Sequence, residues 1–522
     1  MKLSTSDYIS ALRYDLPAGL VVFLVALPLC LGIALASGAP LMAGIIAGIV
    51  GGIVVGSISG SHLSVSGPAA GLTVIVLAAI NELGSFQVFL LAVVLAGIIQ
   101  LVAGYLKAGI LGLYFPSSVI KGMLAAIGLI LILKQIPHFA GVDIEAFGAD
   151  RYTDGEGHNT FTNFFYALRH FHPGALSVGL LSLAIILFWE FPFMQKLGWT
   201  RIVPGALVAV ILSVLINLLY NRLQFEQFII GPGHLVSLPV FGSSESAESV
   251  FPLFPDFAAI LNVSVWKVAV VLAVIASLET LLSIEAVDKL DPHKRRTPQN
   301  LELKAQGLGN FLSGMIGGLP LTAVIVRSTA NLEAGARTKM SAVYHGFLLL
   351  GTVLLIPKLL NMIPLASLAA VLLVVGYKLA KFKLFQRQYK LGWEQFLPFI
   401  ITIVAILFTD LLIGIIIGLQ VGVYFVLRAN YKTPYFYQSE DFAENGGKKV
   451  LLKLSEHVSF INKASLQLTL EHLPDNSEVT IDGSMSQDID FDALNIIYDF
   501  AEVAHERNIK VILNNLPKQI MA

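Results

Sequence analysis

Two proline-interrupted apolar stretches have the residue types and spacing to bind an anion inside a membrane. They read Ser66-Gly67-Pro68-Ala69-Ala70-Gly71-Leu72-Thr73 and Gly317-Gly318-Leu319-Pro320-Leu321-Thr322-Ala323, with the second proline 252 positions after the first. Proline lacks an N–H group and suits the first turn of a helix, so we expect each stretch to begin a short helix. The unpaired N–H groups and positive dipole end of such a helix start attract an anion.

The expected anion contacts are backbone N–H groups at both helix starts. Small side chains let an anion approach the first start closely. Thr322 adds a hydroxyl at the second start, unless that hydroxyl bonds back to its own backbone. Tight helix packing is the alternative interpretation of the glycines and alanines. The candidate residues are Ser66, Pro68, Ala69, Ala70 and Gly71 in the first stretch, and Leu321, Thr322, Ala323 and Val324 in the second.

Two charged residues in apolar segments are further candidates. Glu279 lies near the middle of an apolar run, where a carboxylate is costly and a functional role is the default interpretation. Beside an anion it needs a neutralising partner, and three are open: a proton, a sodium ion, or Arg327. The sodium ion would be completed by Ser283, Thr322 and carbonyls near Pro320. Arg327 stays protonated, so we expect it either to supply positive field to the anion or to pair with Glu279.

The composition indicates which elements hold these residues. Of the 522 residues, 56% are hydrophobic and 13% are charged, and the mean hydropathy is +0.76. This balance is typical of a polytopic membrane protein. Together with the two half-helices, the apolar runs predict fourteen spans of the length that crosses a bilayer. The twelve full runs lie at about 17–37, 40–60, 86–106, 117–134, 174–191, 202–220, 265–285, 303–318, 341–357, 363–378, 396–410 and 411–428.

The spacing of unusual residues favours an internal repeat. Pro28 lies in the first predicted span, and Glu279 lies in the eighth, 251 positions later. This offset nearly equals the offset between the two half-helix prolines. A unit of seven spans is odd, so its repetition must have inverted topology, and such a repeat builds a substrate site at the membrane midplane. We therefore predict a 7+7 inverted repeat of fourteen transmembrane segments.

The distribution of lysine and arginine predicts the orientation. The basic clusters follow spans six, eight and twelve, so we expect the N-terminus and the C-terminal part to be cytoplasmic. The first span lacks a cleavage pattern, and the chain is expected to begin at Met1. The lone Cys30 allows no internal disulfide. The net charge of −1 gives no sign of nucleic-acid binding.

A small soluble α/β domain is expected after Arg428. Short strands are predicted at 450–454, 459–461, 479–482 and 511–513, with helices near 463–473 and 491–507. Asp490 and Asp492 at the second helix start are explained as an N-cap and a first-turn acid. This region carries no nucleophile–base set and no phosphate loop, so an enzyme is not expected.

In its motifs and their order the chain resembles the SulP (sulfate permease) family of anion transporters. The resemblance covers almost the whole length and includes a C-terminal STAS-like domain. It rests on Pro28, Val65-Ser-Gly-Pro-Ala-Ala70, Glu279, Lys294-Arg-Arg-Thr-Pro-Gln-Asn300 and the stretch from Gly318 through Arg327 to Thr338.

The resemblance implies a domain organisation and a mechanism. Residues 1–430 would form the transporter, with a core of spans 1–4 and 8–11 moving in an elevator-like way against a gate of spans 5–7 and 12–14. Residues 431–448 would be a linker, and residues 449–522 the cytoplasmic STAS-like domain. The resemblance further implies a homodimer in the inner membrane that holds a small oxyanion between the half-helices.

Departures from the family pattern bear on selectivity and coupling. Relatives often carry glutamine at the position of Leu29 and an aromatic residue at that of Ile33, so recognition here would depend more on backbone donors; simple packing is the alternative for both residues. Relatives that resemble sodium-coupled carriers tend to have Asp and Thr where this chain has Glu279 and Ser283. Proton coupling and exchange therefore stay open beside sodium.

The expected function is secondary active transport of an inorganic oxyanion, with bicarbonate favoured and sulfate close behind. The preference for bicarbonate rests only on the resemblance of residues 24–32 and 65–74 to a subgroup of the family. The alternatives are an anion exchanger or an uncoupled anion channel on the same fold, a membrane scaffold or sensor acting through the tail, and a nucleobase carrier of similar architecture.

Overall fold

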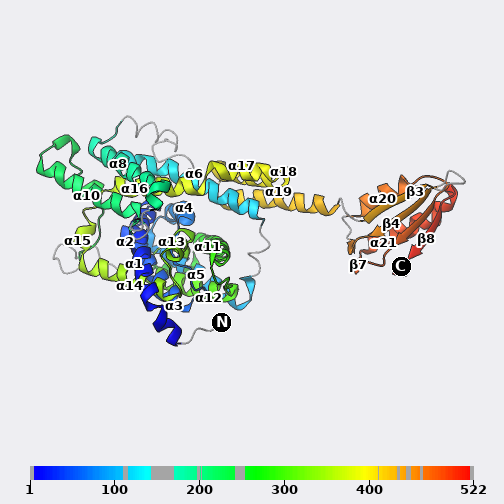
Figure 1. Cartoon of the computed structure of the whole chain (residues 1–522), viewed down its shortest axis with the longest axis horizontal. Coiled ribbons are helices and arrows are strands. Elements are labelled where there is room, and N and C mark those ends of the chain that lie inside the picture. Colours follow the sequence, from blue (N-terminus) through cyan, green and yellow to red (C-terminus); the bar gives the residue numbers. More distant parts are fainter. Residues whose placement is uncertain are drawn as a thin grey trace. The chain divides into compact units, whose positions relative to one another are not determined.

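The computed structural model describes residues 5–109, 116–142, 170–196, 200, 203–240, 253–409, 411–431, 435–441, 448–458 and 462–517. The chain forms two compact units. The first contains Met1–Gly392 and Phe399–Ile417, and the second contains Trp393–Pro398 and Gly418–Ala522. Helices dominate up to Tyr431, and strands follow (Figure 1).

A helix lies in each of the fourteen predicted segments. In the described part of the chain, seven helices are long and apolar enough to cross a membrane, and five more apolar helices are shorter. The number that actually cross stays a prediction. The helices are α1 (Thr5–Ala36), α2 (Leu41–Val50), α4 (Thr73–Leu83), α5 (Phe86–Tyr105), α6 (Ser117–Ala140), α8 (Pro173–Trp189), α10 (Gly205–Arg222), α11 (Val263–Leu290), α12 (Gln299–Met315), α13 (Ile325–Glu333), α14 (Met340–Leu355), α16 (Leu365–Leu379), α18 (Trp393–Phe408) and α19 (Leu411–Tyr431).

Shorter elements connect these helices. A π-helical turn, η1, continues α2 and leads into α3, while short helices lie before and after α16. Two three-residue strands, β1 and β2, precede α4 and α13. The bounds are η1 (Gly51–Val55), α3 (Gly56–Ile58), β1 (Ser66–Pro68), η2 (Ala70–Leu72), α9 (Pro192–Gln195), η5 (Glu226–Phe228), η6 (Pro232–His234), η8 (Phe257–Leu261), β2 (Leu321–Ala323), α15 (Pro357–Leu360) and α17 (Phe382–Lys390).

The helices of the first unit pack in two groups. In one group α1 packs on α2 and α14, and α5 packs on α11 and α12. In the other, α16 packs on α6 and α8, and α8 packs on α10. Figure 1 shows the same grouping, with α8, α10 and α16 drawn apart from α5, α11 and α12. In the predicted repeat, α1 corresponds to α11, and α14 corresponds to α5. The contact between α1 and α14 therefore has its counterpart in the contact between α11 and α5, which is the relation expected of a repeat.

Glycines bring the elements around β1 unusually close. A Cβ atom at Gly51 of η1 would overlap the carbonyl of Ser66 in β1, and one at Gly52 would lie 2.6 Å from Cα of Gly346 in α14. Small residues at such contacts let backbones approach each other in a membrane protein. The glycine-rich end of α2 therefore holds β1 against the helix bundle.

The second unit contains a four-stranded sheet of order β3-β4-β6-β8. The strands β4, β6 and β8 run parallel, and β3 pairs antiparallel with β4. A buried apolar core lies between the sheet and the two helices. The elements are β3 (Tyr435–Asp441), β4 (Lys448–Leu454), β5 (His457–Val458), α20 (Lys463–Glu471), β6 (Glu478–Asp482), β7 (Asp488–Ile489), α21 (Phe491–Val503), η10 (Ala504–Arg507) and β8 (Lys510–Asn514).

Most tail predictions agree with these elements, and one needs correction. Strands occupy three of the four predicted strand positions, and the fourth, 459–461, lies outside the described residues. Asp490 is the N-cap of α21 and accepts a hydrogen bond from the N–H of Asp492 at 2.9 Å, as predicted. The predicted linker 431–448 contains the strand β3, because Tyr435–Asp441 finds a pairing partner in β4.

Candidate anion-binding site at the paired half-helices

The two proline-containing stretches meet as a small antiparallel sheet. Ser66 of β1 lies opposite Ala323 of β2, and Pro68 lies opposite Leu321. Neither proline begins a helix, which corrects the prediction from sequence. The helices α4 and α13 start five residues after their prolines, at Thr73 and at residue 325.

The ladder between β1 and β2 uses backbone groups that were predicted to bind the anion. The N–H of Val324 donates to the carbonyl of Val65 at 2.9 Å. Hydrogen-bonded pairs alternate along an antiparallel ladder, so Gly67 and Thr322 form the next such pair. The N–H groups of Val324 and Thr322 are therefore engaged within the protein.

Side chains from α11 and α12 engage the remaining N–H groups of β2. Asn310 accepts from the N–H of Leu321 at 2.7 Å and donates to its carbonyl at 3.1 Å. The hydroxyl of Thr280 accepts from the N–H of Ala323 at 3.2 Å. The expectation that Leu321, Ala323 and Val324 offer free backbone donors is therefore wrong, because a buried donor takes whatever partner the fold supplies.

Unengaged donors lie at the helix starts beyond the two strands. Among the described residues none accepts from the N–H groups of Ala70 or Gly71, or from those of Ile325 and Val326. The first turn of a helix leaves such groups without an intrahelical partner. Ile325 and Val326 are 39% and 38% exposed, so the second helix start lies at the surface of the described structure.

Glu279 lies directly beside the first helix start. A Cβ atom at Gly71 would lie 2.5 Å from Oε1 of Glu279, so only glycine leaves room for the carboxylate in this position. Oε2 of Glu279 is buried and has no hydrogen-bond partner among the described residues. A buried carboxyl oxygen without a partner fits either a bound cation or a proton on the carboxyl group.

Arg327 lies against the beginning of the same segment. It is fully buried, and Nη2 lies 3.4 Å from both the carbonyl of Pro68 and Sγ of Cys30. A Cβ atom at Gly67 would overlap Nη1. Nε and Nη1 have no partner in the described structure. The guanidinium group therefore lies under β1, between α1 and α2.

Arg327 and Glu279 form no ion pair, which excludes one of the three partners considered for the acid. The neighbours of Arg327 are Gly67, Cys30 and Pro68, whereas Glu279 lies against Gly71. The guanidinium group thus lies at the Gly67 end of this segment, and the carboxylate lies at the Gly71 end. A proton or a cation remains for Glu279.

The other predicted residues are buried around this crossing. Thr322 is fully buried, and its hydroxyl donates to the carbonyl of Ala323 at 3.3 Å, so the backbone-bonded alternative for this hydroxyl applies. Leu29, Ile33 and Ser283 are 5%, 3% and 3% exposed. No cluster of three or more His, Cys, Asp or Glu side chains suited to a metal occurs among the described residues.

A polar stripe on α12 was missed from the sequence. Glu302, Gln306 and Asn310 are spaced four residues apart and are all buried. Gln306 donates to the hydroxyl of Ser66 at 2.7 Å and to Glu302 at 3.0 Å. Residues four apart share one helix face, so this spacing was a readable signal. The stripe anchors both β1 and β2 to α12.

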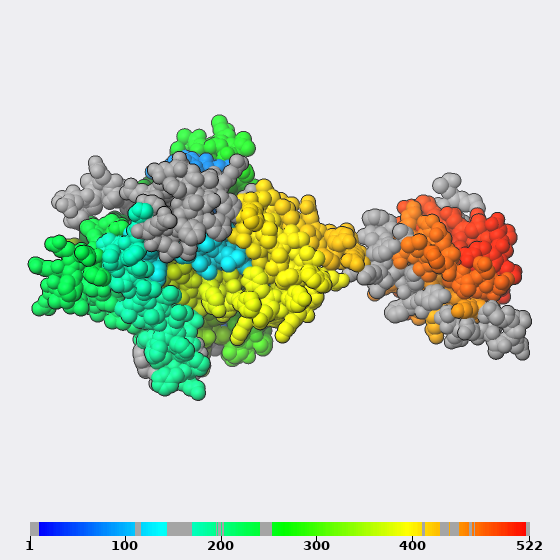
Figure 2. Space-filling view, turned by 90° about the horizontal axis from the view of Figure 1, so that it is seen from above, coloured from blue at the N-terminus to red at the C-terminus, as the bar shows by residue number. Residues whose placement is uncertain are grey.

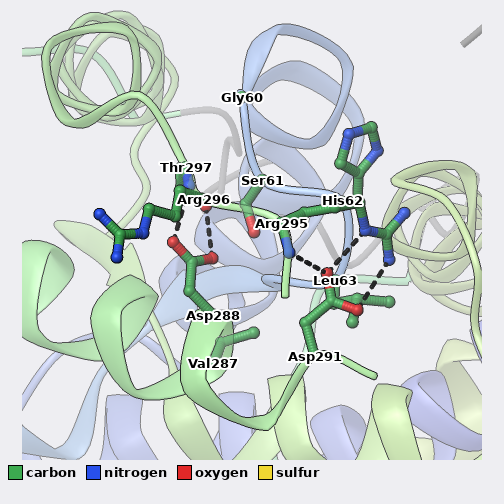
Figure 3. Close-up of a pocket in the computed structure, with 10 residues that line it drawn as sticks. All are labelled: Gly60, Ser61, His62, Leu63, Val287, Asp288, Asp291, Arg295, Arg296 and Thr297. Atoms are coloured by element: carbon green, nitrogen blue, oxygen red, sulfur yellow. Dashed lines mark hydrogen bonds and ion pairs between the residues drawn. The ribbon is translucent and has the colours of Figure 1, made fainter. Parts of the chain in front are cut away.

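A second polar cluster lies where α11 ends (Figure 3). Asp288 accepts from both the N–H and the hydroxyl of Thr297 at 2.7 Å. Asp291 accepts from Nε of Arg295 at 2.6 Å. Burial acts to raise the pKa of Asp291, but hydrogen bonds from Arg295 and His293, with the charge of Arg295, hold that pKa below its usual range. These hydrogen bonds to Asp288 and Asp291 therefore close the loop that follows α11. This loop lies outside the anion site.

Interrupted helices that meet within a bundle of apolar helices define a membrane transport fold. This chain belongs to the sulfate permease family, since the profile described as "Sulfate permease family" matches residues 12–404. YvdB of Bacillus subtilis, named as a candidate sulfate transporter, is 28% identical over 82% of this chain and 76% of its own length. The bicarbonate transporter BicA of Picosynechococcus sp. is 26% identical over 81% and 71%.

Solved structures share the fold. The transmembrane domain of a cyanobacterial bicarbonate transporter BicA covers 78% of this chain and 97% of its own, with a TM-score of 0.62 and 25% identity. The murine anion transporter Solute Carrier 26 family member A9, in an inward-facing state, covers 99% and 87% with a TM-score of 0.78 and 15% identity. The chain is thus a multi-pass membrane protein of an anion transporter family, and not an enzyme.

Proposed function

We propose that this protein is a secondary active transporter of a small inorganic oxyanion, with bicarbonate favoured over sulfate. The anion would bind between the starts of α4 and α13 and cross the membrane by elevator-like alternating access. The observation that carries the proposal is the β1–β2 pair, which brings the unengaged N–H groups of Ala70, Gly71, Ile325 and Val326 to one crossing. Backbone donors and two helix dipoles suit an oxyanion.

Arg327 would add positive field behind this site. The guanidinium group is permanently charged and has no acidic partner within bonding distance among the described residues. A buried unpaired charge costs several kcal/mol, and a bound anion nearby would offset part of that cost. The positive charge of Arg327 would thus strengthen anion binding without direct contact, because β1 would lie between the guanidinium group and the anion.

Glu279 would couple the anion to a cation. Its orphaned Oε2 lies beside the same helix start that would hold the anion. A negatively charged carboxylate repels the anion, whereas a proton or a sodium ion on it removes the repulsion. Each ligand would therefore strengthen binding of the other, which is the requirement for coupled uptake.

The relatives' names support both candidate substrates, because bicarbonate and sulfate each occur among them. The fourteen spans, the 7+7 inverted repeat, the cytoplasmic termini, the inner-membrane location and the homodimer belong to the same proposal. They rest on the resemblance and on the positions of the apolar and basic segments.

The test is uptake of labelled bicarbonate and of labelled sulfate into proteoliposomes under separate sodium and proton gradients. We expect one gradient to concentrate one of the anions, and Glu279→Gln to abolish that accumulation. Glu285→Gln is the matched control, because Glu285 lies on the same helix and pairs with Lys289 at the surface. Concentrative uptake by Glu279→Gln equal to wild type would remove the coupling role.

Exchange is the second candidate, because this chain has Glu279 and Ser283 where relatives that resemble sodium-coupled carriers tend to have Asp and Thr. If counter-anion loading drives uptake and neither cation gradient does, the protein is an exchanger. A flux that follows voltage without saturating would instead indicate a channel.

A further inference from the structure

A histidine side chain caps the start of α8. His172 is the N-cap residue, and its Nδ1 atom accepts a hydrogen bond from the N–H of Ala175 at 3.2 Å. The N–H of His172 donates to the carbonyl of Ala140 at 2.9 Å, which ties the cap to the end of α6. An imidazole nitrogen accepts a hydrogen bond only while it carries no proton. This cap therefore exists only while the ring is neutral, with its hydrogen on Nε2.

The ring of His172 lies against a second imidazole ring. The ring centroid of His234 in η6 is 5.7 Å away, and the two planes are tilted by 41°. Both residues are partly exposed, so protons from solvent reach them. Two positive charges this close repel each other, and the positive dipole end of α8 disfavours a cation at its N-cap. A proton on His172 is therefore opposed by the cap, by the helix dipole and by a charged His234.

The surroundings of His172 favour its neutral form. The described ionisable residues on the elements around it, and just before it, are His138, His170, Tyr220, Arg222, Glu226 and His234. Burial, and then the charge of His234, hold the pKa of His172 below its usual range. The contribution of the neutral ring to stability is therefore complete above the unfolded pKa of about 6.5 and is lost as the pH falls through the lower, folded value.

The contact between the two histidines lies where residues 226–238 meet α8. A Cβ atom at Gly174 of α8 would overlap the carbonyl of Phe228 in η5. Further along the same segment, the N–H of Val236 donates at 2.9 Å to the carbonyl of Ile363, just before α16. In Figure 2 the green surface of the segment that contains η5 and η6 adjoins the teal surface of α8. Residues 226–238 thus fasten the start of α8 to the segment that precedes α16.

We propose that His172 and His234 form a proton-sensitive latch that holds residues 226–238 on the start of α8. The latch is closed while both rings are neutral. A proton on Nδ1 of His172 occupies the lone pair that accepts from Ala175, and the resulting charge repels a protonated His234. The segment then separates from the start of α8. The predicted orientation places this junction on the outer side of the membrane, but the proposal depends neither on that side nor on which anion the protein transports.

The test measures how fast a methanethiosulfonate reagent labels Val236→Cys in the purified full-length protein in detergent. Val236 is 3% exposed, so a cysteine there is protected while the latch is closed. Leu261→Cys, at a position that is 90% exposed, is the reference that corrects for the effect of pH on the thiolate. The native Cys30 is buried and should stay unlabelled. We expect the ratio of the two labelling rates to rise roughly fivefold from about pH 8 to about pH 5.5, because the cap is lost.

Three variants of the Val236→Cys protein separate titration from packing. His172→Asn cannot titrate but keeps a good N-cap acceptor, so its ratio should stay constant over the same pH range. His234→Gln removes only the repulsion between the rings and should reduce the rise. His457→Asn changes an exposed histidine of the second unit and should leave the rise unaltered.

Thermal midpoints at about pH 8 provide the control for folding. We expect His172→Asn to match the Val236→Cys parent, because asparagine replaces the cap. The proposal is overturned if the labelling ratio of the parent does not rise on acidification. It is also overturned if His172→Asn and His234→Gln both show the same rise as the parent.

Discussion

Two glycines four residues apart make room for the two charged side chains of the candidate site. Gly67 lies against the guanidinium group of Arg327, and Gly71 lies against the carboxylate of Glu279. Neither glycine has a positive φ angle, so the need for glycine comes from space and not from backbone conformation. The motif that suggested close approach of an anion thus also accommodates the protein's own charges.

Gly71→Ala tests the position of Glu279. The added methyl group lies 2.5 Å from Oε1, so the carboxylate must move, and we expect transport to fall by roughly tenfold while the protein still folds. The double variant Gly71→Ala/Glu279→Asp shortens the acid and should recover part of the activity. Gly351→Ala, where a methyl group meets open space, is the control. Full activity of Gly71→Ala in the proteoliposome assay would contradict this placement.

Asp291 makes stability depend on pH. Because its pKa is lower in the folded protein than in the unfolded chain, its contribution is complete above the unfolded value of about 4. That contribution is lost as the pH falls through the lower, folded value. Thermal midpoints of wild type and Asp291→Asn should therefore differ most at neutral pH and converge below about pH 4. A difference that stays constant with pH would show that the carboxylate charge is not what stabilises this loop.

At the scale of elements, the short strands β1 and β2 determine which groups face a ligand. The strands tie the starts of two half-helices together although 255 positions separate their paired centres, Gly67 and Thr322. Side chains from α11 and α12 then satisfy the remaining donors of β2. The polar stripe on α12 is consequently a positioning element for the site.

Asn310→Ala tests that role. The substitution leaves both the N–H and the carbonyl of Leu321 buried without their side-chain partner, and we expect a loss of about 1–3 kcal/mol in stability. The thermal midpoint and the apparent affinity for the anion should both decrease. Asn221→Ala, which removes a hydrogen bond to the backbone of its own helix, should change neither. An unaltered midpoint for Asn310→Ala would exclude the anchoring role.

At the scale of the whole molecule, the C-terminal unit has its own core. Val450, Leu452, Val479 and Ile481 of the sheet pack with Leu466 and Ile497 of the helices, and all six are fully buried. We expect a fragment of residues 435–522 to be soluble and to unfold cooperatively, with circular dichroism of a mixed α/β domain. Leu466→Ala should lower the midpoint, since large-to-small core changes cost about 2–5 kcal/mol. A fragment that gives no cooperative transition would contradict an independent domain.

The positions of the helices could be predicted well, whereas the partners of the polar residues could not. Each of the twelve apolar runs near 20 residues contains a helix, because burial in lipid imposes length and composition directly on the sequence. The role of Pro68 was misjudged because a three-residue strand has no sequence signal apart from its partner. The pairing of Arg327 with Glu279 was equally open until both environments were known.

The sequence alone therefore determined the membrane class, the two interrupted helices and the acid near their meeting point, since each depends on local composition or on a proline. Only the tertiary structure decided which N–H groups have no hydrogen-bond partner. It also decided which residues lie beside the charged groups of Arg327 and Glu279. The reason is physical. A hydrogen bond or a steric gap depends on atoms that the fold brings together from segments hundreds of residues apart, and local sequence carries no record of those neighbours.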